Sequence, residues 1–431
     1  MNFEKKQKIF NYVSLIIIFV LGIYYLGRLV YFKYLNNDNT ILSDLLAEQI
    51  KQRQNKYEII PTLINDNNTY RFINKANNNY VKFMGYTWRI IKVNEDNTIT
   101  LITDDNIISL NYGNISSFND SYINKWLNDF NIKYTGIFYN TLNHEYLVNT
   151  NNCFDKIENI SCNIKNNDYK VSLLSLYDYE KAGGMNSYLN NNSEYWLVNN
   201  SNNNSLGYVK NDGTVSLSNK NFGVRPVITL KSDTKVISGN GSSDNPYIIE
   251  KHLVTSLKDA YIGEYIKLNN SLWRIVFKNI DKIKLVSEES VYETYYSNYD
   301  NSTDLNLLNY LNNDYYNNFE EKELIVSGKF YDGVISDYDY TTTYNSSINL
   351  NVGLLSIAEP FVYDVENTFT LSRTDNETGI LIIDENNNLF EDTVSNYHYV
   401  RPSIYIKNDV TISGMGTYLN PYIIGGEINE N

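Results

Sequence analysis

The residues best suited to chemistry in this 431-residue chain are its histidines and cysteines, and both are few. The three histidines are His144, His252 and His398, and none belongs to a His-Glu-x-x-His metalloprotease pattern. The sequence also lacks the Gly-x-Ser-x-Gly turn of hydrolases and a phosphate-binding glycine loop. It therefore favours a non-enzymatic role and predicts no catalytic residue, no cofactor and no metal site. Enzymatic activity stays open, because two distant carboxylates can hydrolyse a glycan.

The two cysteines, Cys153 and Cys162, lie close together in a polar stretch and do not form a Cys-x-x-Cys pattern. Outside the cytoplasm, such a pair favours a disulfide that closes a short loop. The loop-entropy model assigns that crosslink about 2–3 kcal/mol of stability. Free thiols or metal ligands are the alternatives.

Trp196 is the aromatic residue with the clearest binding potential, because it precedes the amide-rich sequence NNSNNNS. Amide side chains on a loop can hydrogen-bond a glycan or a peptide, and a neighbouring indole ring can stack on it. The sequence thus predicts ligand contacts from Trp196, Asn199, Asn200 and Asn202. A solvated hairpin loop without a ligand is the alternative.

Two Trp-Arg and Arg-Pro pairs suggest structural roles instead. Trp88 and Trp273 each lie in an apolar strand, which favours core packing over ligand stacking. Arg225 and Arg401 each precede a proline and follow a valine. A partly buried arginine must be paired, so we expect an ion pair with an inner carboxylate at both positions.

The elements that hold these residues begin with an apolar segment at the N-terminus. Residues 9–27 carry no charge, and at about 1.5 Å per residue they match a bilayer core of about 30 Å. Lysines precede the segment and acidic residues follow it, which predicts a cytoplasmic N-terminus and an extracytoplasmic remainder. A cleaved signal peptide is the rival interpretation, but bulky residues occupy the expected cleavage region.

A short amphipathic helix is expected after the membrane segment. Ile41, Leu42, Leu45, Leu46 and Ile50 recur at helical spacing, and a proline at position 61 ends any continuation. This stalk helix could dimerise or lie against the first folded domain.

The strongest signal in the remainder is internal similarity. The sequence YVKFMGYTWRII at 80–91 matches YIKLNNSLWRIV at 265–276. Further matches follow in the same order in both halves, which indicates two diverged copies of one domain. These matches are Leu173-Leu174-Ser175 with Leu354-Leu355-Ser356, Val224-Arg225-Pro226 with Val400-Arg401-Pro402, and Asn245-Pro246-Tyr247 with Asn420-Pro421-Tyr422.

Each copy shows the same pattern of elements. An opening hairpin, a short helix from Tyr122 to Phe130, a polar stretch and closing strands predict an α+β, β-rich fold. We expect these regions: 1–35 cytoplasmic tail and transmembrane anchor, 36–66 stalk helix and linker, 67–250 first repeat domain, 251–262 linker, and 263–431 second repeat domain.

Several of these motifs resemble a bacterial domain of unassigned function found in surface and secreted proteins of Firmicutes. The likeness is carried by Trp126-Leu127-Asn128, Leu173-Leu174-Ser175, Tyr195-Trp196-Leu197, Asp212-Gly213 and Val224-Arg225-Pro226. The second copy is looser, since Phe369-Thr370-Leu371 replaces Tyr-Trp-Leu. The closing Gly-x-Gly-x-x-x-Asn-Pro-Tyr pattern further resembles the C-type-lectin-like fold, and fold alone does not assign function.

The net charge of -14 argues against nucleic acid as a partner. Together these patterns predict a single-pass bacterial membrane protein at the cell surface, with non-enzymatic modules that bind a glycan, a peptide or an envelope component. The alternatives are an extracytoplasmic hydrolase that acts on glycans, and a structural or assembly protein.

Overall fold

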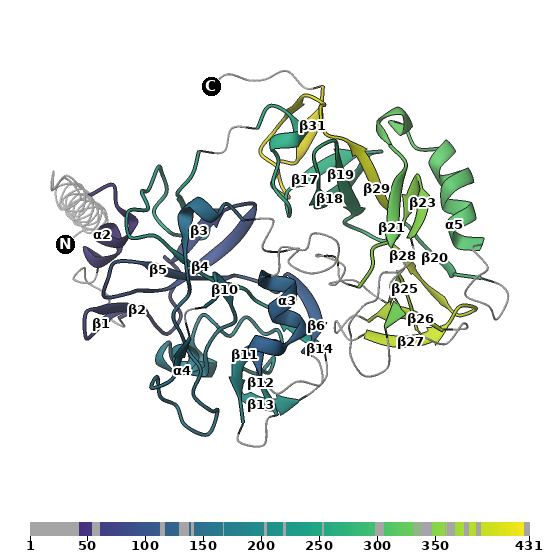
Figure 1. Cartoon of the computed structure of the whole chain (residues 1–431). Helices are drawn as coiled ribbons and strands as arrows, with labels where there is room; N and C mark the ends of the chain where they lie inside the picture. The colour runs from purple at the N-terminus through teal and green to yellow at the C-terminus, as the bar shows by residue number, and fades with distance from the viewer. Residues whose placement is uncertain are drawn as a thin grey trace, which may run out of the picture. The chain divides into compact units, whose positions relative to one another are not determined.

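A computed structural model gives the structure of the chain, in which strands predominate (Figure 1). The chain divides into two units, Met1–Asp44 and Leu45–Asn431. We call 45–251 the first half and 254–425 the second half of the larger unit. The structure describes residues 43–53, 61–112, 117–128, 138, 142–166, 168–201, 205–218, 221–251, 254–297, 306–331, 334–335, 347–357, 359, 367–374, 379–384 and 389–425.

The predicted transmembrane segment, 9–27, lies outside the described residues. Among the residues that are described, no helix is both long and apolar enough to cross a bilayer.

The larger sheet of the first half is built around the opening hairpin. Its order is β1-β2-β4-β5-β15-β10, with β3 and β7 pairing with β4 and β15, and β16 pairing with β3. The long strand β4 and its neighbour β5 are buried at almost every position, because both of their faces are covered. The strands are β1 Leu63–Asp66, β2 Thr69–Phe72, β3 Tyr80–Phe83, β4 Tyr86–Val93, β5 Ile99–Thr103, β7 Leu147–Val148, β10 Val171–Ser172, β15 Val227–Leu230 and β16 Tyr247–Ile248.

A second sheet of the first half has the order β13-β12-β11-β14-β6. β11 and β14 run parallel, and the remaining pairs of this sheet are antiparallel. The strands are β6 Ile108–Asn111, β11 Tyr195–Asn200, β12 Leu206–Val209, β13 Val215–Ser218 and β14 Asn221–Val224, and a separate ribbon joins β8 Asn152–Cys153 to β9 Lys165–Asn166.

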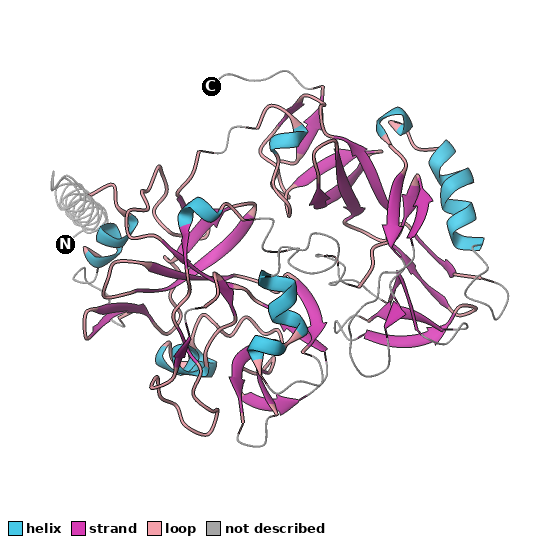
Figure 2. Cartoon of the chain, in the orientation of Figure 1, coloured by secondary structure: helices cyan, strands magenta, loops and turns pink. Residues whose placement is uncertain are grey.

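The second half also has two main sheets (Figure 2), with orders β24-β29-β19-β18-β17-β31-β30 and β20-β28-β25-β26-β27. The first contains β17 Tyr265–Leu268, β18 Ser271–Lys278, β19 Lys282–Ser287, β24 Val352–Gly353, β29 Ser403–Lys407, β30 Ile412–Ser413 and β31 Tyr422–Ile424. The other contains β20 Tyr292–Tyr295, β22 Val334–Ile335, β25 Thr368–Thr374, β26 Gly379–Ile383, β27 Leu389–Thr393 and β28 Tyr397–Val400, and β21 Gly328–Tyr331 pairs separately with β23 Ser347–Leu350.

Strand order and direction in the second half repeat those of the first. The run β16-β3-β4-β5-β15-β10 has its counterpart in β31-β17-β18-β19-β29-β24. The one parallel pair of each run joins Tyr247 to Val81 and Tyr422 to Ile266. In the smaller sheets β11 runs parallel to β14, just as β25 runs parallel to β28. The tyrosines of both Asn-Pro-Tyr motifs thus occupy the same place in their sheets.

The helices that the structure describes are short. The α-helices are α2 Leu46–Lys51, α3 Tyr122–Asn128, α4 Leu176–Lys181 and α5 Asn306–Tyr310, which continues as the π-helix η6 Leu311–Tyr315. The 3-10 turns are η1 Phe118–Asp120, η3 His144–Tyr146, η4 Gly184–Asn186, η5 Leu257–Asp259 and η7 Lys322–Leu324. The predicted helix from Tyr122 is present, and its predicted end at Phe130 lies outside the described residues.

The stalk region packs on the first half rather than standing apart from it. Leu46 and Ile50 of α2 are buried, and the Leu46 amide donates to the carbonyl of Thr234. Strand β1, from Leu63, pairs with β2 and therefore belongs to the first sheet although it precedes the predicted domain start at residue 67. A short helix is stabilised when its apolar face packs in this way on a neighbouring domain.

Candidate functional site

Trp196, the predicted ligand contact, lies in the core. Its side chain is 0% exposed, and its indole N–H donates to the carbonyl of Leu110 at 2.8 Å. The rings of Tyr112 and Phe222 pack edge-on against it. A ring enclosed in this way has no face for a ligand, so the predicted contact is wrong. Trp196 does precede the amide-rich loop, as predicted, but it occupies the second position of the buried strand β11, so its indole ring faces the core.

The asparagines that follow Trp196 are also engaged in the fold. The Asn199 side chain is buried, accepts the amide of Leu176 at 2.6 Å and donates to the carbonyls of Cys153 and Asp155. The Asn200 side chain accepts from Lys156 Nζ at 2.9 Å. Asn202 lies outside the described residues. Asn199 therefore stabilises a loop, which corrects the prediction that it binds a ligand.

Cys153 and Cys162 form the predicted disulfide. The crosslink closes a loop that Asp155 also organises, because its carboxylate accepts from Ser161 Oγ and from the amide of Ile164. Burial acts to raise the pKa of Asp155, but these hydrogen bonds outweigh it and lower that pKa. Crosslink and hydrogen bonds together fix the loop beside Asn199.

Trp88 and Trp273 have the structural role that their strands predict. Both side chains are 0% exposed. The indole N–H of Trp88 donates to the carbonyl of Phe83 at 2.9 Å, and that of Trp273 donates to Leu268 at 3.1 Å. Each bond closes the hairpin in which the tryptophan lies, so each ring is satisfied without a ligand.

Arg225 and Arg401 are buried, but among the described residues no carboxylate lies within ion-pair distance of Arg225. Its Nε donates to the carbonyl of Thr103 and its Nη1 to that of Leu189, and its guanidinium covers the ring of Tyr195. These carbonyl and ring contacts replace the predicted carboxylate. Arg401 Nε likewise donates to the carbonyl of Ser287.

A buried ion cluster that the sequence did not reveal lies in the first half. The Asp178 carboxylate is 2.6 Å from Arg71 Nη1 and 2.9 Å from Lys92 Nζ, and it accepts from Ser175 Oγ at 3.0 Å. Burial acts to raise the pKa of Asp178, but Lys92 and Arg71 outweigh it and hold that pKa well below its usual range. This buried carboxylate lies three residues after the serine of the first Leu-Leu-Ser motif, Ser175.

The second half contains a related pair. Glu359 also follows a Leu-Leu-Ser motif, and its carboxylate lies 2.5 Å from the buried Lys284 Nζ. Lys92 comes from β4, whereas Lys284 comes from β19, the strand next to β18. Lys92 on β4 pairs with Thr100 on β5, and Phe277 on β18 pairs with Lys284 on β19. The two lysines thus occupy opposite members of comparable cross-strand pairs, and each half has a lysine–carboxylate contact.

A cavity of about 560 Å³ lies where the β3–β4 hairpin approaches the start of the second half. We call it the Lys82 cleft. Its walls are aromatic, apolar and charged side chains, a mixture typical of ligand sites. The side chains used below are Lys82, Met84, Asp104, Glu250, Glu264, Arg274, Met415 and Tyr418, and all of these residues line it.

The β3–β4 turn that lines this cleft has an unusual backbone. Met84 and Gly85 connect the paired residues Phe83 and Tyr86, with φ values of 54° and 76°. Two positive φ values define the type I′ turn, in which asparagine and glycine are favoured and methionine is strained. A Cβ added at Gly85 would lie 2.5 Å from the carbonyl oxygen of Ile262, so only glycine fits there.

Two glutamates that line the cleft accept hydrogen bonds from the residues around it. Glu250 accepts the amide of Met84 at 2.8 Å and a hydrogen bond from the Tyr261 hydroxyl. Glu264 accepts the amide of Tyr261 at 2.7 Å and the hydroxyl of Tyr422 at 2.9 Å. These bonds stabilise the strained turn and the segment that covers it.

An arginine, a tyrosine and a carboxylate recur at matching places in the two halves. Arg89 lies over the ring of Tyr80 and 3.1 Å from the Asp104 carboxylate. Arg274 lies over the ring of Tyr265, and its Nη1 is 3.9 Å from Glu288. Burial raises the pKa of Tyr265 to about 12, so its hydroxyl stays neutral at ordinary pH. Arg274, Tyr265 and Asp104 line the Lys82 cleft.

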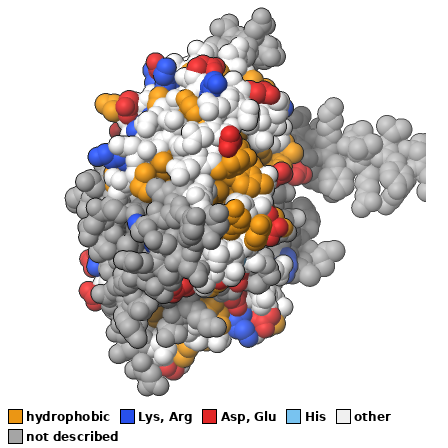
Figure 3. All heavy atoms as spheres, turned by 90° about the vertical axis from the view of Figure 1, so that its right-hand side faces the viewer, with side chains coloured by type: hydrophobic (Ala, Val, Ile, Leu, Met, Phe, Trp, Pro, Cys, Tyr) orange, Lys and Arg blue, Asp and Glu red, His pale blue; other side chains and the backbone are white. Residues whose placement is uncertain are grey.

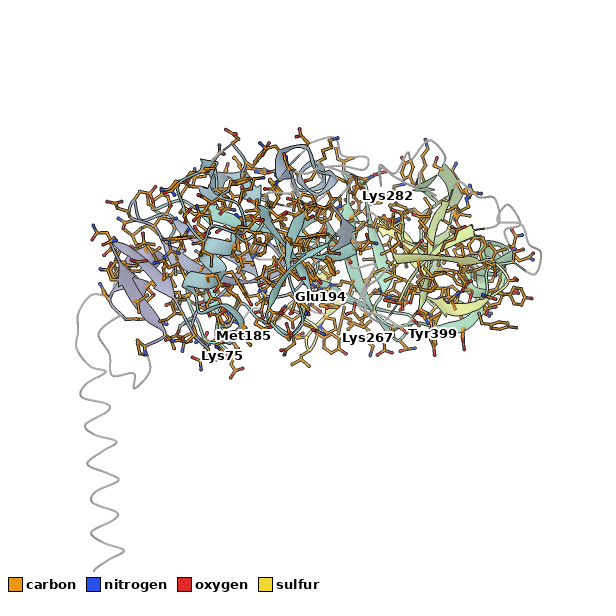
Figure 4. All side chains as sticks on the ribbon, turned by 90° about the horizontal axis from the view of Figure 1, so that it is seen from below. Lys75, Met185, Glu194, Lys267, Lys282 and Tyr399 are labelled. Carbon is orange, nitrogen blue, oxygen red and sulfur yellow. A yellow bond between two sulfur atoms is a disulfide. The ribbon has the colours of Figure 1, made fainter. Side chains whose placement is uncertain are left out.

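Lys82 is the cation available to a ligand. In the described part of the chain, its ammonium makes no hydrogen bond and no ion pair within 4.0 Å. Burial lowers the pKa of Lys82, the Glu264 carboxylate opposes that shift, and the Arg274 guanidinium adds to it. A partly desolvated amine in a cleft is an established marker of a functional site. Its counterpart in the second half, Lys267, is exposed at the outer edge of the fold (Figure 4).

The catalytic alternatives find little support in the described residues. No group of three metal-ligating side chains occurs there. His398 Nε2 lies 2.8 Å from Asp392, as in a hydrolase dyad. The rings of Phe369 and Phe390 enclose the imidazole, and its Nδ1 is buried without a hydrogen-bond partner. A nucleophile would have to meet that nitrogen, so this dyad has a structural geometry.

Comparison of the chain with protein-family models, curated proteins and solved structures returned no match.

Proposed function

We propose that this chain is a membrane-anchored surface protein that binds a ligand in the Lys82 cleft without transforming it. The observation that carries the proposal is the ammonium of Lys82, which faces a cavity among aromatic and charged side chains with no ion-pair partner. The neighbouring charged groups are already engaged, Asp104 with Arg89 and Arg274 with Glu288. Lys82 is therefore free to bind a group that comes from outside.

The proposed organisation has an anchor at 9–27 and two diverged copies of one module. The equal strand orders and the two parallel pairs at Tyr247 and Tyr422 support the duplication. The hairpin tryptophans support it as well, because Trp88 and Trp273 bond to the carbonyl of the residue that ends the preceding strand. The likeness to the C-type-lectin-like fold stays a prediction from the closing motifs.

Divergence between the copies favours a single ligand site. The β3–β4 turn contains the strained Met84, whereas the corresponding β17–β18 turn uses Asn269 and Asn270, which tolerate positive φ. A strained residue persists only where surrounding contacts hold it, and Glu250 supplies such a contact. Strain of this kind is common in ligand-binding sites, and it is present in the copy whose lysine faces the cleft.

The test is a binding screen with the full-length chain in lipid nanodiscs, run against envelope glycans, soluble peptidoglycan fragments and short peptides. Lys82→Ala should raise the dissociation constant of the ligand at least tenfold, because it removes a charge-assisted hydrogen bond. The matched variant Lys267→Ala should bind like the wild type. Equal binding by both variants would refute the site, and turnover of a glycan would favour the hydrolase alternative.

A further inference from the structure

The turn between β30 and β31 exposes a group of large apolar side chains. The exposed fractions are 68% for Met415, 57% for Tyr418 and 92% for Leu419. Apolar side chains are also visible on the face drawn in Figure 3, among scattered acidic and basic ones. Single exposed apolar residues are ordinary, but several within one short turn indicate an interaction surface. We call Met415, Tyr418 and Leu419 the apolar tip.

The fold itself does not require an apolar tip. In the first half, the corresponding turn precedes Asn245-Pro246-Tyr247 and carries Asn240, Ser243 and Asp244, all exposed. Both turns have the same backbone, since the amide of Asn240 donates to the carbonyl of Asn245 and that of Met415 donates to Asn420. The glycines on either side of Asn240 and of Met415 have positive φ in both halves. One backbone thus carries a polar surface in one half and an apolar surface in the other.

The apolar tip is continuous with the Lys82 cleft. Met415 and Tyr418 line the cleft as well as being exposed. The ring of Tyr418 packs edge-on against Tyr265, at 5.6 Å between centroids, and Tyr265 lies under the guanidinium of Arg274. One molecule bound in the cleft can therefore contact both Lys82 and the apolar tip.

We propose that the occupant is a polypeptide segment that places a carboxylate at Lys82 and packs apolar side chains on the apolar tip. This inference rests on the proposed function and names the ligand class of the same site. The ammonium at the cleft supplies charge complementarity for the carboxylate. Four carboxylates also line the cleft, those of Asp104, Asp105, Glu250 and Glu264, and none lies within ion-pair distance of Lys82. Glu250, Glu264 and Asp104 are held by other donors.

The residue types at the tip favour a polypeptide over a glycan. Sugars are bound mainly by flat aromatic faces and hydrogen bonds, whereas Met415 and Leu419 offer flexible aliphatic surface. Methionine is over-used at surfaces that bind peptides of varied sequence. The carboxylate can come from the C-terminus of the segment or from an aspartate or glutamate side chain, and the two sources are separable by experiment.

The experiment uses nine-residue peptides rich in Leu, Ile and Phe, and the full-length chain in nanodiscs, with dissociation constants from fluorescence polarisation. Each peptide is made with a free C-terminus or a C-terminal amide, and with or without one internal Glu. The key variant gives the tip the residues of the first half: Met415→Asn, Tyr418→Ser and Leu419→Asp. The reverse exchange, Asn240→Met, Ser243→Tyr and Asp244→Leu, alters the other turn and serves as the matched control.

We expect the key variant and Lys82→Ala each to weaken peptide binding at least tenfold, and the control to bind like the wild type. If amidation of the C-terminus alone abolishes binding, the carboxylate comes from the C-terminus. If an internal Glu restores binding to the amidated peptide, the carboxylate comes from a side chain. No peptide binding, or binding indifferent to the tip, overturns the inference. If a glycan then binds and depends on Lys82 but not on the tip, the proposed function stands without the polypeptide ligand. Circular dichroism of each variant establishes that it is folded.

Discussion

Replacing Asp178 by asparagine removes one negative charge from a site that is closed to water. The carboxylate is 1% exposed and holds Arg71 at 2.6 Å and Lys92 at 2.9 Å, and both cations are themselves buried. The amide of asparagine keeps the shape but leaves the buried Lys92 without a counter-charge, and it leaves Arg71 with only the part-exposed Asp66, whose Oδ2 is 3.8 Å from Arg71 Nε. Breaking a buried ion pair in this way costs about 3–5 kcal/mol. At roughly 2–4 °C per kcal/mol, the melting temperature should fall by about 6–20 °C.

Differential scanning calorimetry of the full-length chain measures this change, and limited proteolysis locates it in the first half. Asp212→Asn is the control, because Asp212 is exposed and lies 3.9 Å from Lys210, so it should leave the melting temperature unchanged. The reasoning is refuted if Asp178→Asn melts within about 1 °C of the wild type, a shift well below one kcal/mol.

The same cluster sets a direction for acid stability. The pKa of Asp178 is depressed in the folded chain, while the unfolded chain has the ordinary value of about 3.9. A depressed carboxyl pKa gives stability that is present above the unfolded value and is lost as the pH falls toward the folded value. Wild type should therefore lose stability below about pH 4 more steeply than Asp178→Asn, as followed by urea unfolding.

Three further changes have defined outcomes. Trp196→Ala should destabilise the chain by about 3–5 kcal/mol, because it leaves a cavity where a fully buried ring was. A loss of unfolding free energy below about 1 kcal/mol would contradict the position of this ring in the core. The double variant Cys153→Ser with Cys162→Ser should lose about 2–3 kcal/mol of unfolding free energy. Reductant should lower the melting temperature of the wild type and leave that of the double variant unchanged. Glu359→Gln should cost about 3 kcal/mol, at the lower end for buried pairs because Glu359 is 17% exposed, and its effect should appear in proteolysis of the second half.

Much of the fold follows from sequence signals that are local. Alternation and turn residues predicted the opening hairpin, which the strands β4 and β5 form. Helical spacing predicted α3 and α2. The repeated Trp-Arg-Ile and Asn-Pro-Tyr motifs lie at equivalent strands, because each marks a position with a fixed neighbour in the sheet.

The candidate site did not follow from the sequence, because it depends on distant pairings. Trp196 precedes an amide-rich loop in the sequence, but its neighbour Tyr195 pairs with Gly223 and the indole lies in the core. Lys82 has a sequence context similar to that of Lys267, YVKF against YIKL. In the structure Lys82 is partly buried near Glu264 and Arg274, whereas Lys267 is exposed.

The two lysine–carboxylate contacts were missed for a similar reason. Nothing next to Asp178 or Glu359 in the sequence marks either residue as paired, and the partners Lys92 and Lys284 come from strands far away in the chain. A signal did exist, since each half has an acidic residue three positions after Leu-Leu-Ser. Each of the two lysines is buried and therefore requires a counter-charge.

The most direct test of the central claim, that the Lys82 cleft is the ligand site, is hydrogen–deuterium exchange of the full-length chain with and without its strongest binder from the screen. Slower exchange is predicted for the β3–β4 turn at Met84–Gly85, for 261–265 and for the turn at Met415–Tyr418. Slower exchange confined to β11 and β12, or no change at the β3–β4 turn while the ligand is bound, would contradict the claim.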